Sequence, residues 1–183
     1  MEKLSDRISF VKKKGEVEIH ISGDTKKGSM ILLWVWIVAW TACGISIIYE
    51  MLQINSNESK IFLIVFSAFW VYFEYKIGYA FFWRKKGKEI IRIAPDKLFL
   101  KRDISGRGRE LIFESENIRK LKSHQTGEWD FFKFINESYF MIAGEKVSFI
   151  YSGKEIKFGI QLSEEEVKKL LKFFKHNTKL DLA

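Results

Sequence analysis

A single cysteine and a single proline are present in this chain of 183 residues. Cys43 has no second cysteine to pair with, so an intramolecular disulfide is excluded. The three histidines, His20, His124 and His176, do not have the spacing of metal ligands. We therefore expect neither a disulfide nor a metal site in this protein.

Motifs for catalysis are also missing. The segment Gly106-Arg107-Gly108 is too short for a phosphate-binding loop and lacks the Lys-Ser/Thr pair that such loops need. Ser123, His124 and Asp130 are close together in the sequence, but proximity within one loop does not make a catalytic triad. We therefore predict that the protein is not an enzyme, has no catalytic residues and uses no cofactor.

Two long apolar runs are present in the first half of the chain. Met30–Tyr49 contains twenty residues without a charge, and as a helix it would be about 30 Å long, the thickness of a bilayer's hydrocarbon core. Ile61–Trp83 is nearly as apolar and is interrupted only by Glu74 and Lys76. Buried helices of soluble proteins rarely stay free of charge for so long, so we predict two transmembrane helices. The first is expected to be a retained anchor, because the preceding residues are too acidic for a signal peptide.

The positive charges beside these runs predict the orientation of the chain. Lys26 and Lys27 precede the first run, whereas the connecting segment holds only Lys60. Four cations follow the second run: Arg84, Lys85, Lys86 and Lys88. Because Lys and Arg are concentrated on the cytoplasmic side of membrane proteins, we expect both termini in the cytoplasm.

After residue 84 the apolar pattern changes to a period of two, which is typical of β-strands. Ile91 and Ile93 alternate with Arg92, and Pro95 lies in the turn that follows. The clearest hairpin joins Val147–Tyr151 to Ile156–Ile160 through Ser152-Gly153. Further strands are expected at 98–100, 110–113, 118–121, 129–135 and 139–142. The aromatic stretch 129–134 is expected to be a strand with Phe131 in the core, rather than a membrane or partner contact.

A helix over about 163–176 is predicted to close this domain. Ser163 and Glu166 have the spacing of a capping box, and Leu162 and Val167 that of a hydrophobic staple. The apolar stripe of the helix is Val167, Leu170, Leu171 and Phe174. Such a stripe indicates that the helix covers a sheet.

Several short segments of the chain have a familiar pattern: Val17–Ile21, Gly87–Ile93, Phe149–Tyr151, Lys154–Gly159, and Leu162, Glu164 and Glu166. In these residues the chain resembles an uncharacterised group of small bacterial membrane proteins. In that group a polar N-terminal strand precedes a two-helix transmembrane hairpin and a cytoplasmic pleckstrin-homology-like domain. Ser22-Gly23-Asp24 departs from the proline-containing turn that usually ends the first strand. The group has no established activity or functional residues, so the resemblance implies an architecture and a bacterial plasma (inner) membrane.

We therefore expect an α+β membrane protein, in which a two-helix transmembrane hairpin is joined to an antiparallel β domain capped by a C-terminal amphipathic helix. The expected divisions are a cytoplasmic N-terminal strand segment 1–28, transmembrane helices 29–50 and 61–83, an outer loop 51–60, and the β domain 84–183. Whether the N-terminal strands join the cytoplasmic sheet is left open by the sequence.

Glu74 and Lys76 are the ionisable residues expected inside the membrane, where a charge costs about 2.5 to 3.5 kcal/mol on insertion scales. We favour a structural explanation in which Lys76 extends to the interface and Glu74 is protonated or bonds to Thr41 or a tyrosine. The alternative is that the protein is an accessory subunit of a transporter or ion-handling complex that uses Glu74.

The domain after residue 83 carries 22 Lys and Arg against 15 Asp and Glu, a net charge of +7. No nucleic-acid recognition motif accompanies this charge, so nucleic acid is not an expected partner. The candidate contacts to anionic lipid headgroups are Arg84, Lys85, Lys86, Lys88, Lys101, Arg102, Arg107 and Arg109. The expected function is non-enzymatic binding of either anionic lipid or a membrane or cytoplasmic protein partner, with homo-oligomers left open.

Overall fold

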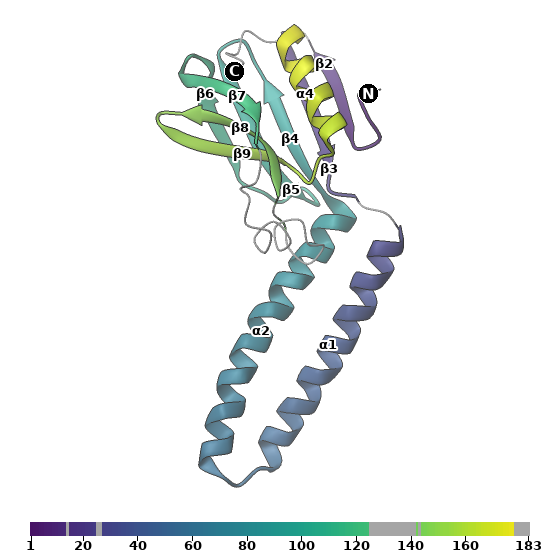
Figure 1. Ribbon diagram of the computed structural model, residues 1–183, viewed down its shortest axis with the longest axis vertical. Helices are drawn as coiled ribbons and strands as arrows, with labels where there is room; N and C mark the ends of the chain where they lie inside the picture. Colours follow the sequence, from purple (N-terminus) through teal and green to yellow (C-terminus); the bar gives the residue numbers. More distant parts are fainter. Residues whose placement is uncertain (14, 25–26, 125–141, 143, 178–183) are drawn as a thin grey trace.

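The computed structural model describes residues 1–13, 15–24, 27–124, 142 and 144–177, and shows an α+β protein with a long helical hairpin attached to a β domain (Figure 1). The helices are α1 (Lys27–Gln53), α2 (Asn57–Lys86) and α4 (Glu164–Asn177), and a short 3-10 helix spans Ser115–Asn117. The strands are β1 (Glu2–Lys3), β2 (Ile8–Lys13), β3 (Glu16–Ser22), β4 (Gly87–Ile93), β5 (Lys97–Ile104), β6 (Glu110–Glu114), β7 (Ile118–Ser123), β8 (Glu145–Tyr151) and β9 (Lys154–Ile160).

The described strands form two antiparallel sheets. The larger has six strands in the order β1-β2-β3-β4-β5-β6, and the smaller has the order β7-β8-β9. β3 pairs with β4, with Val17 opposite Ile93 and Ser22 opposite Lys88. The N-terminal strands therefore belong to the same sheet as the strands after the helices. The β domain begins at β1 rather than at residue 84 as expected, and the helical hairpin is inserted between two paired strands.

One apolar core lies between the two sheets and α4. Phe149 and Phe158 from the smaller sheet and Phe174 from α4 are each at most 1% exposed. Phe173 of α4 packs against Phe10 of β2, with ring centroids 4.6 Å apart. The buried face of α4 thus includes Phe173, whereas Leu171 of the predicted stripe is only partly buried.

The predicted start of α4 is confirmed. The backbone N–H of Glu166 donates to Ser163 Oγ at 3.2 Å, and the N–H of Ser163 donates to Glu166 Oε2 at 3.0 Å. Leu162 and Val167 are both buried, as a hydrophobic staple requires. The predicted hairpin is confirmed as β8 and β9, and the strands predicted at 110–113 and 118–121 as β6 and β7. The strands predicted at 129–135 and 139–142 lie outside the described residues, apart from Ile142.

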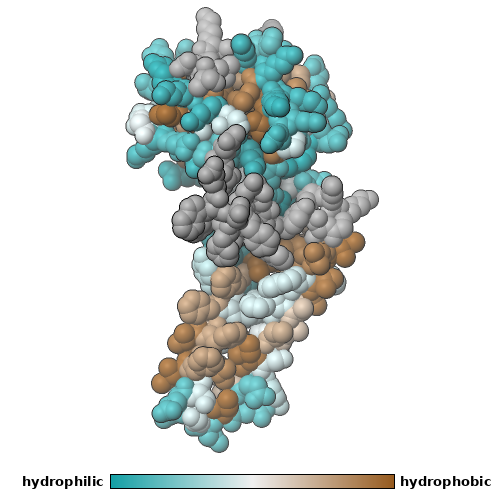
Figure 2. Space-filling view, in the orientation of Figure 1, coloured by the Kyte–Doolittle hydropathy of each residue, from teal (hydrophilic) through white to brown (hydrophobic). Residues whose placement is uncertain are grey.

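Helices α1 and α2 are long and apolar enough to cross a membrane, and most of their hydrophobic side chains lie on the surface (Figure 2). The expected loop 51–60 is reduced to residues 54–56, because α1 continues to Gln53 and α2 begins at Asn57. Ser56 caps α2 by accepting the N–H of Ser59 at 3.5 Å. At its other end, α2 continues to Lys86 and passes directly into β4.

The two long helices pack closely at Gly44 and Trp70. The indole N–H of Trp70 donates to the carbonyl oxygen of Trp40 at 3.0 Å. A Cβ atom at residue 44 would overlap the Trp70 indole ring. Glycine is therefore needed here because the neighbouring helix approaches its backbone.

We expect Gly44→Ala to lower the free energy of unfolding of the hairpin by about 1 to 3 kcal/mol, as overpacking does in other cores. Gly78→Ala is the matched control in α2, because a Cβ atom there meets no other atom within 4 Å. Denaturant titration of the full-length protein in detergent, followed by helical circular dichroism, measures both variants. Equal stability of the two variants would show that the Gly44–Trp70 contact does not hold the helices together.

Candidate functional site at the junction of the helices and the sheet

The junction between the helices and the domain is built around Trp83. This side chain in the last turns of α2 is 2% exposed. A Cβ atom at Gly23 would lie 2.8 Å from the Trp83 carbonyl oxygen, and one at Gly87 would overlap the Trp83 side chain. The N–H of Gly23 donates to the carbonyl oxygen of Gly87 at 2.9 Å. The two glycines thus let β3 and β4 stay paired up to the point where the helices begin.

An ion cluster around the buried carboxylate of Glu89 connects the two sheets next to this junction. Glu89 of β4 has a side chain only 1% exposed, and its Oε1 lies 3.2 Å from Nε of Arg102 in β5. Its Oε2 accepts the backbone N–H groups of Gly159 and Ile160 in β9, at 2.8 and 3.0 Å. Arg102 also donates to Glu145 of β8 at 2.7 Å. Burial raises the pKa of the Glu89 carboxyl above its ordinary value, although Arg102 and the two N–H groups oppose that shift.

We expect Glu89→Ala to lower the free energy of unfolding by about 1 to 3 kcal/mol for each of the two buried backbone N–H groups that would lose its acceptor, while Arg102 keeps Glu145 as a partner. Glu110→Ala is the control, since it removes an exposed carboxylate 3.2 Å from Arg92. Such surface pairs contribute about 0 to 1 kcal/mol. Chemical denaturation of the full-length variants distinguishes them, and a loss no larger for Glu89→Ala than for Glu110→Ala would contradict the structural role.

Exposed cations gather at the end of the domain from which the helices extend, here called the helix-proximal end. Gly87 pairs with Ile104, so the turn after β5 lies at this end of the sheet. Arg107 and Arg109 are exposed there, Lys85 and Lys86 are exposed at the end of α2, and Lys88 is half-buried in β4. We call this group the cationic collar: Lys85, Lys86, Lys88, Arg107 and Arg109.

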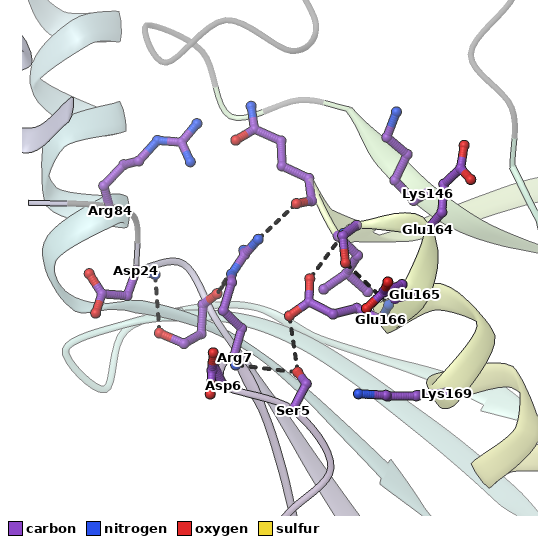
Figure 3. A pocket seen from close by; sticks show the side chains of 14 residues that line it. Ser5, Asp6, Arg7, Asp24, Arg84, Lys146, Glu164, Glu165, Glu166 and Lys169 are labelled. Carbon is purple, nitrogen blue, oxygen red and sulfur yellow. Dashed lines mark hydrogen bonds between the residues drawn. The ribbon is translucent and has the colours of Figure 1, made fainter. Parts of the chain in front are cut away.

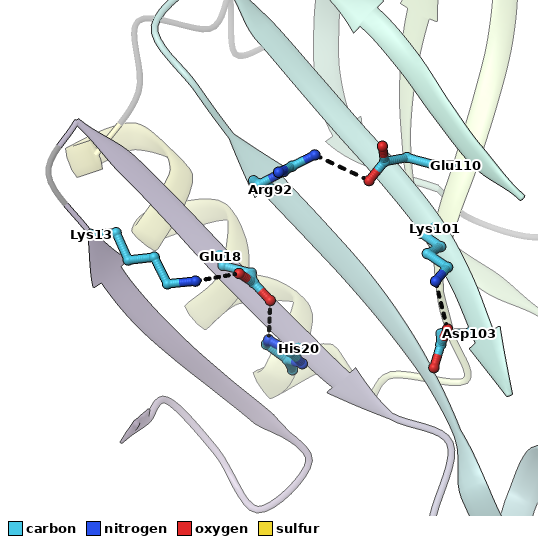
Figure 4. A network of polar contacts seen from close by, with 7 residues as sticks. All are labelled: Lys13, Glu18, His20, Arg92, Lys101, Asp103 and Glu110. Carbon is cyan, nitrogen blue, oxygen red and sulfur yellow. Dashed lines mark hydrogen bonds and ion pairs between the residues drawn. The ribbon is translucent and has the colours of Figure 1, made fainter. Parts of the chain in front are cut away.

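Three of the cations predicted to contact lipid do not belong to the cationic collar, because their side chains are buried or lie next to carboxylates. Arg102 forms ion pairs with the carboxylates of Glu89 and Glu145. Arg84 is 2% exposed, so its guanidinium is withdrawn from the outer surface. Lys101 lies 2.7 Å from Asp103 (Figure 4). Alternating charged residues near a strand end do not reveal which of them pair, so the sequence did not separate these three from the collar.

Asp103 fixes the turn that presents Arg107. Its carboxylate is nearly buried and also accepts the backbone N–H of Gly106 at 3.0 Å. The hydrogen bond from Lys101, together with the N–H of Gly106, lowers the pKa of Asp103 below its ordinary value.

Because the pKa of Asp103 is lowered in the folded protein, the stability that its carboxylate contributes depends on pH. A carboxyl with a lower pKa in the folded protein adds stability above the unfolded pKa of about 3.9, and that stability is lost as the pH falls through the folded pKa. We expect Asp103→Asn to cost about 1 to 3 kcal/mol at pH 7, and expect the difference from wild type to shrink as the pH falls from 7 through the unfolded and then the folded pKa of Asp103. Denaturation of both proteins across this pH range is the measurement. A difference that is independent of pH would contradict the ion pair.

Glu74 contacts the other helix of the hairpin. Its Oε1 lies 2.8 Å from Thr41 Oγ1, which is also 2.8 Å from the carbonyl oxygen of Ile37. Of the alternatives that the sequence left open for Glu74, the structure shows the hydrogen bond with Thr41. Lys76 is exposed, and its Nζ lies 5.6 Å from the ring centroid of Tyr72.

A cleft of about 970 Å³ opens beside the junction, between the loop at Ser5–Arg7, the end of α2 and the first turn of α4 (Figure 3). Arg7 holds its wall by donating to the carbonyl oxygens of Ser22, Ile160 and Gln161 at 2.7 to 3.2 Å. Ser5 Oγ donates to Glu166 Oε1 at 3.0 Å, which ties the loop to α4. Sequence reasoning missed this cleft, because its walls come from segments far apart in the chain.

Among the described residues, no group of three or more His, Cys, Asp or Glu side chains is arranged to hold a metal ion. Comparisons of this chain with protein-family models, curated proteins and solved structures found no match.

Proposed function

We propose that this protein is a non-enzymatic integral membrane protein whose cytoplasmic domain binds anionic lipid at the membrane surface. The observation that carries the proposal is the position of the cationic collar at the helix-proximal end. Cations near an anionic bilayer surface each contribute about 1 kcal/mol of attraction. If α1 and α2 span the bilayer, the collar faces the lipid headgroups.

The surface of the helical hairpin supports its insertion in a membrane. Large apolar side chains on both helices are strongly exposed, including Ile31 at 65%, Phe62 at 68% and Phe69 at 62%. An apolar surface this continuous is unfavourable in water and is matched by hydrocarbon. We infer a bacterial inner membrane from the resemblance described above.

The orientation is proposed on two grounds. The cations of the collar favour the cytoplasm for the domain, as the positive-inside rule predicts. The packing of Phe10 against Phe173 joins the N-terminal and C-terminal parts of the chain in one domain. Both termini are therefore assigned to the cytoplasmic side.

The strand order supports a pleckstrin-homology-like domain. Within the described residues, four strands (β3 to β6), then three strands (β7 to β9) in a second sheet, and then α4 follow the order of such a domain. In this proposal the helical hairpin is inserted between the first two of the seven strands, and β1 and β2 extend the sheet at its edge.

Two other functions have less support. A protein partner is favoured by Leu111 and Ile112 of β6, which are 40% and 56% exposed. An accessory subunit of a transporter or ion-handling complex would use Glu74, but the described partner of Glu74 is Thr41 in the same hairpin. That contact favours a role within the hairpin.

We expect the full-length protein to retain phosphatidylglycerol over phosphatidylcholine in native mass spectrometry. Replacing Lys85, Lys86, Arg107 and Arg109 together by Gln should reduce this preference by about tenfold or more, because four cations are removed from the surface. The preference of the wild type should also weaken in about 0.5 M salt, which screens exposed charges.

The matched control replaces four exposed cations at the other end of the domain: Lys97, Lys154, Lys172 and Lys175. This variant has the same net charge as the collar variant and should keep the preference of the wild type. An unchanged preference in the collar variant, or equal losses in both variants, would refute lipid binding by the collar.

A further inference from the structure

We propose that the side of α2 turned away from α1 binds a transmembrane helix of another protein, one that carries a carboxylate near the middle of the membrane. The inference rests on the proposed membrane insertion and is independent of lipid binding by the cationic collar. It concerns four exposed residues, here called the polar stripe: Tyr72, Tyr75, Lys76 and Tyr79.

The polar stripe lies on the face of α2 opposite its contact with α1. Glu74 contacts Thr41 of α1, and Lys76 follows Glu74 by two residues, so the two side chains lie on nearly opposite sides of the helix. Tyr72, Lys76 and Tyr79 are spaced by four and three residues and therefore share one face. Along its middle, α2 lies beside α1 and no other described helix or strand (Figure 1). Within the described residues, the polar stripe is thus uncovered.

Hydroxyl groups accompany the lysine on this face. Tyr72, Tyr75 and Tyr79 are 52%, 68% and 47% exposed. Tyrosines in membrane helices are enriched at the headgroup level, whereas Tyr72 is eleven residues from each end of the apolar run Ile61–Trp83. Polar groups that face hydrocarbon find no hydrogen-bond partner there. A polar stripe at this depth therefore indicates a protein neighbour rather than lipid.

Lys76 extends toward the middle of the membrane, rather than toward the interface as we expected from the sequence. Its Nζ lies 5.6 Å from the ring centroid of Tyr72, which is one turn farther from the β domain. This is the usual direction of a helical side chain, toward the N-terminus of its helix. The backbone at Lys76 is about 15 Å along the helix from its end at Lys86. The ammonium thus lies at a depth where an unpaired charge is costly.

A carboxylate is the partner that this ammonium requires. Among the described residues, no carboxylate forms an ion pair with Lys76, whose printed contact is the ring of Tyr72. Charged groups inside a membrane pair with one another, and such a pair is strong because the dielectric there is low. The hydroxyls of Tyr72 and Tyr75 are additional donors to the same carboxylate. A partner helix with one Asp or Glu at this depth therefore satisfies the whole stripe.

The charges of this chain disfavour a second copy as the occupant. Glu74 is the single carboxylate in the two apolar runs, and its side chain is turned to Thr41. Two copies with the same orientation would also bring two Lys76 ammonium groups to the same depth, where they repel. Anionic headgroups lie at the membrane surface, away from the direction in which Lys76 extends. The occupant is therefore a different membrane protein.

The test uses the full-length protein in phosphatidylcholine vesicles with a fluorescent probe peptide. The probe is a single transmembrane helix of alternating Leu and Ala with one central Glu, and the comparison peptide has Gln in its place. A central Glu can meet Lys76 in either orientation of the peptide. We expect energy transfer from protein to peptide to show about tenfold tighter binding of the Glu peptide, the effect of one charge-assisted hydrogen bond.

Variants of the lysine connect this preference to the polar stripe. Lys76→Gln should abolish the preference for the Glu peptide, whereas Lys76→Arg should keep it because the charge is retained. Lys85→Gln is the matched control, since it removes an exposed lysine of the same helix outside the apolar run. This control should bind both peptides like the wild type. Flotation with the vesicles shows that each protein is inserted.

Equal binding of the two peptides by the inserted wild type, or an unchanged preference in Lys76→Gln, would overturn the proposal. Energy transfer between two labelled copies of the protein that is lost in Lys76→Gln would assign the face to a second copy and also overturn it. So would weaker retention of phosphatidylglycerol by Lys76→Gln than by the wild type, which would assign the face to lipid. A protein that does not float with the vesicles would refute membrane insertion, and with it the proposed function. The collar variant leaves the peptide preference unchanged, so the two proposals fail separately.

Discussion

The pairing of β3 with β4 is the interaction on which the rest of the structure depends. These strands flank the helical hairpin and stay in register from Val17 opposite Ile93 to Ser22 opposite Lys88. Paired strands lie about 4.8 Å apart, whereas packed helix axes lie about 8 to 10 Å apart. The chain must therefore diverge within a few residues of the sheet. Gly23, Gly87 and the buried Trp83 make that divergence without breaking the pairing.

The same constraint determines what surrounds the junction. Glu89 follows Gly87 by two residues, so the ion cluster that joins β4 to β9 lies next to the end of α2. The register of β4 with β5 also brings the turn with Arg107 to this end. The exposed cations of the collar and the arginine that holds the sheets together are consequently neighbours in sequence and in space.

Features encoded by local patterns were predictable from the sequence. The capping box at Ser163 and the hairpin around Ser152-Gly153 depend on residues a few positions apart, and both are confirmed. The contact of Glu74 with Thr41 was predictable as one of few alternatives, because a carboxyl expected inside a membrane requires a polar neighbour and few are present in the other helix. In each case the partner lies nearby in the sequence or is one of very few candidates.

Features that depend on distant pairings were not predictable. A period of two identifies β3 as a strand but does not say that its neighbour follows after two long helices. Arg102 and Arg107 look alike in the sequence, yet one is held by Glu89 and the other is exposed. The cleft requires Arg7, Arg84 and the start of α4 to meet, and only the assembled fold brings them together.

The insertion of the helices within a sheet also affects the order of events during synthesis. β3 leaves the ribosome before α1 and α2, whereas its partner β4 leaves after them. The N-terminal strands must therefore wait with one edge unpaired, a state prone to wrong pairing. Completion of the sheet is delayed until both helices have been made. The six-stranded sheet can therefore form only after the whole helical hairpin has been synthesised.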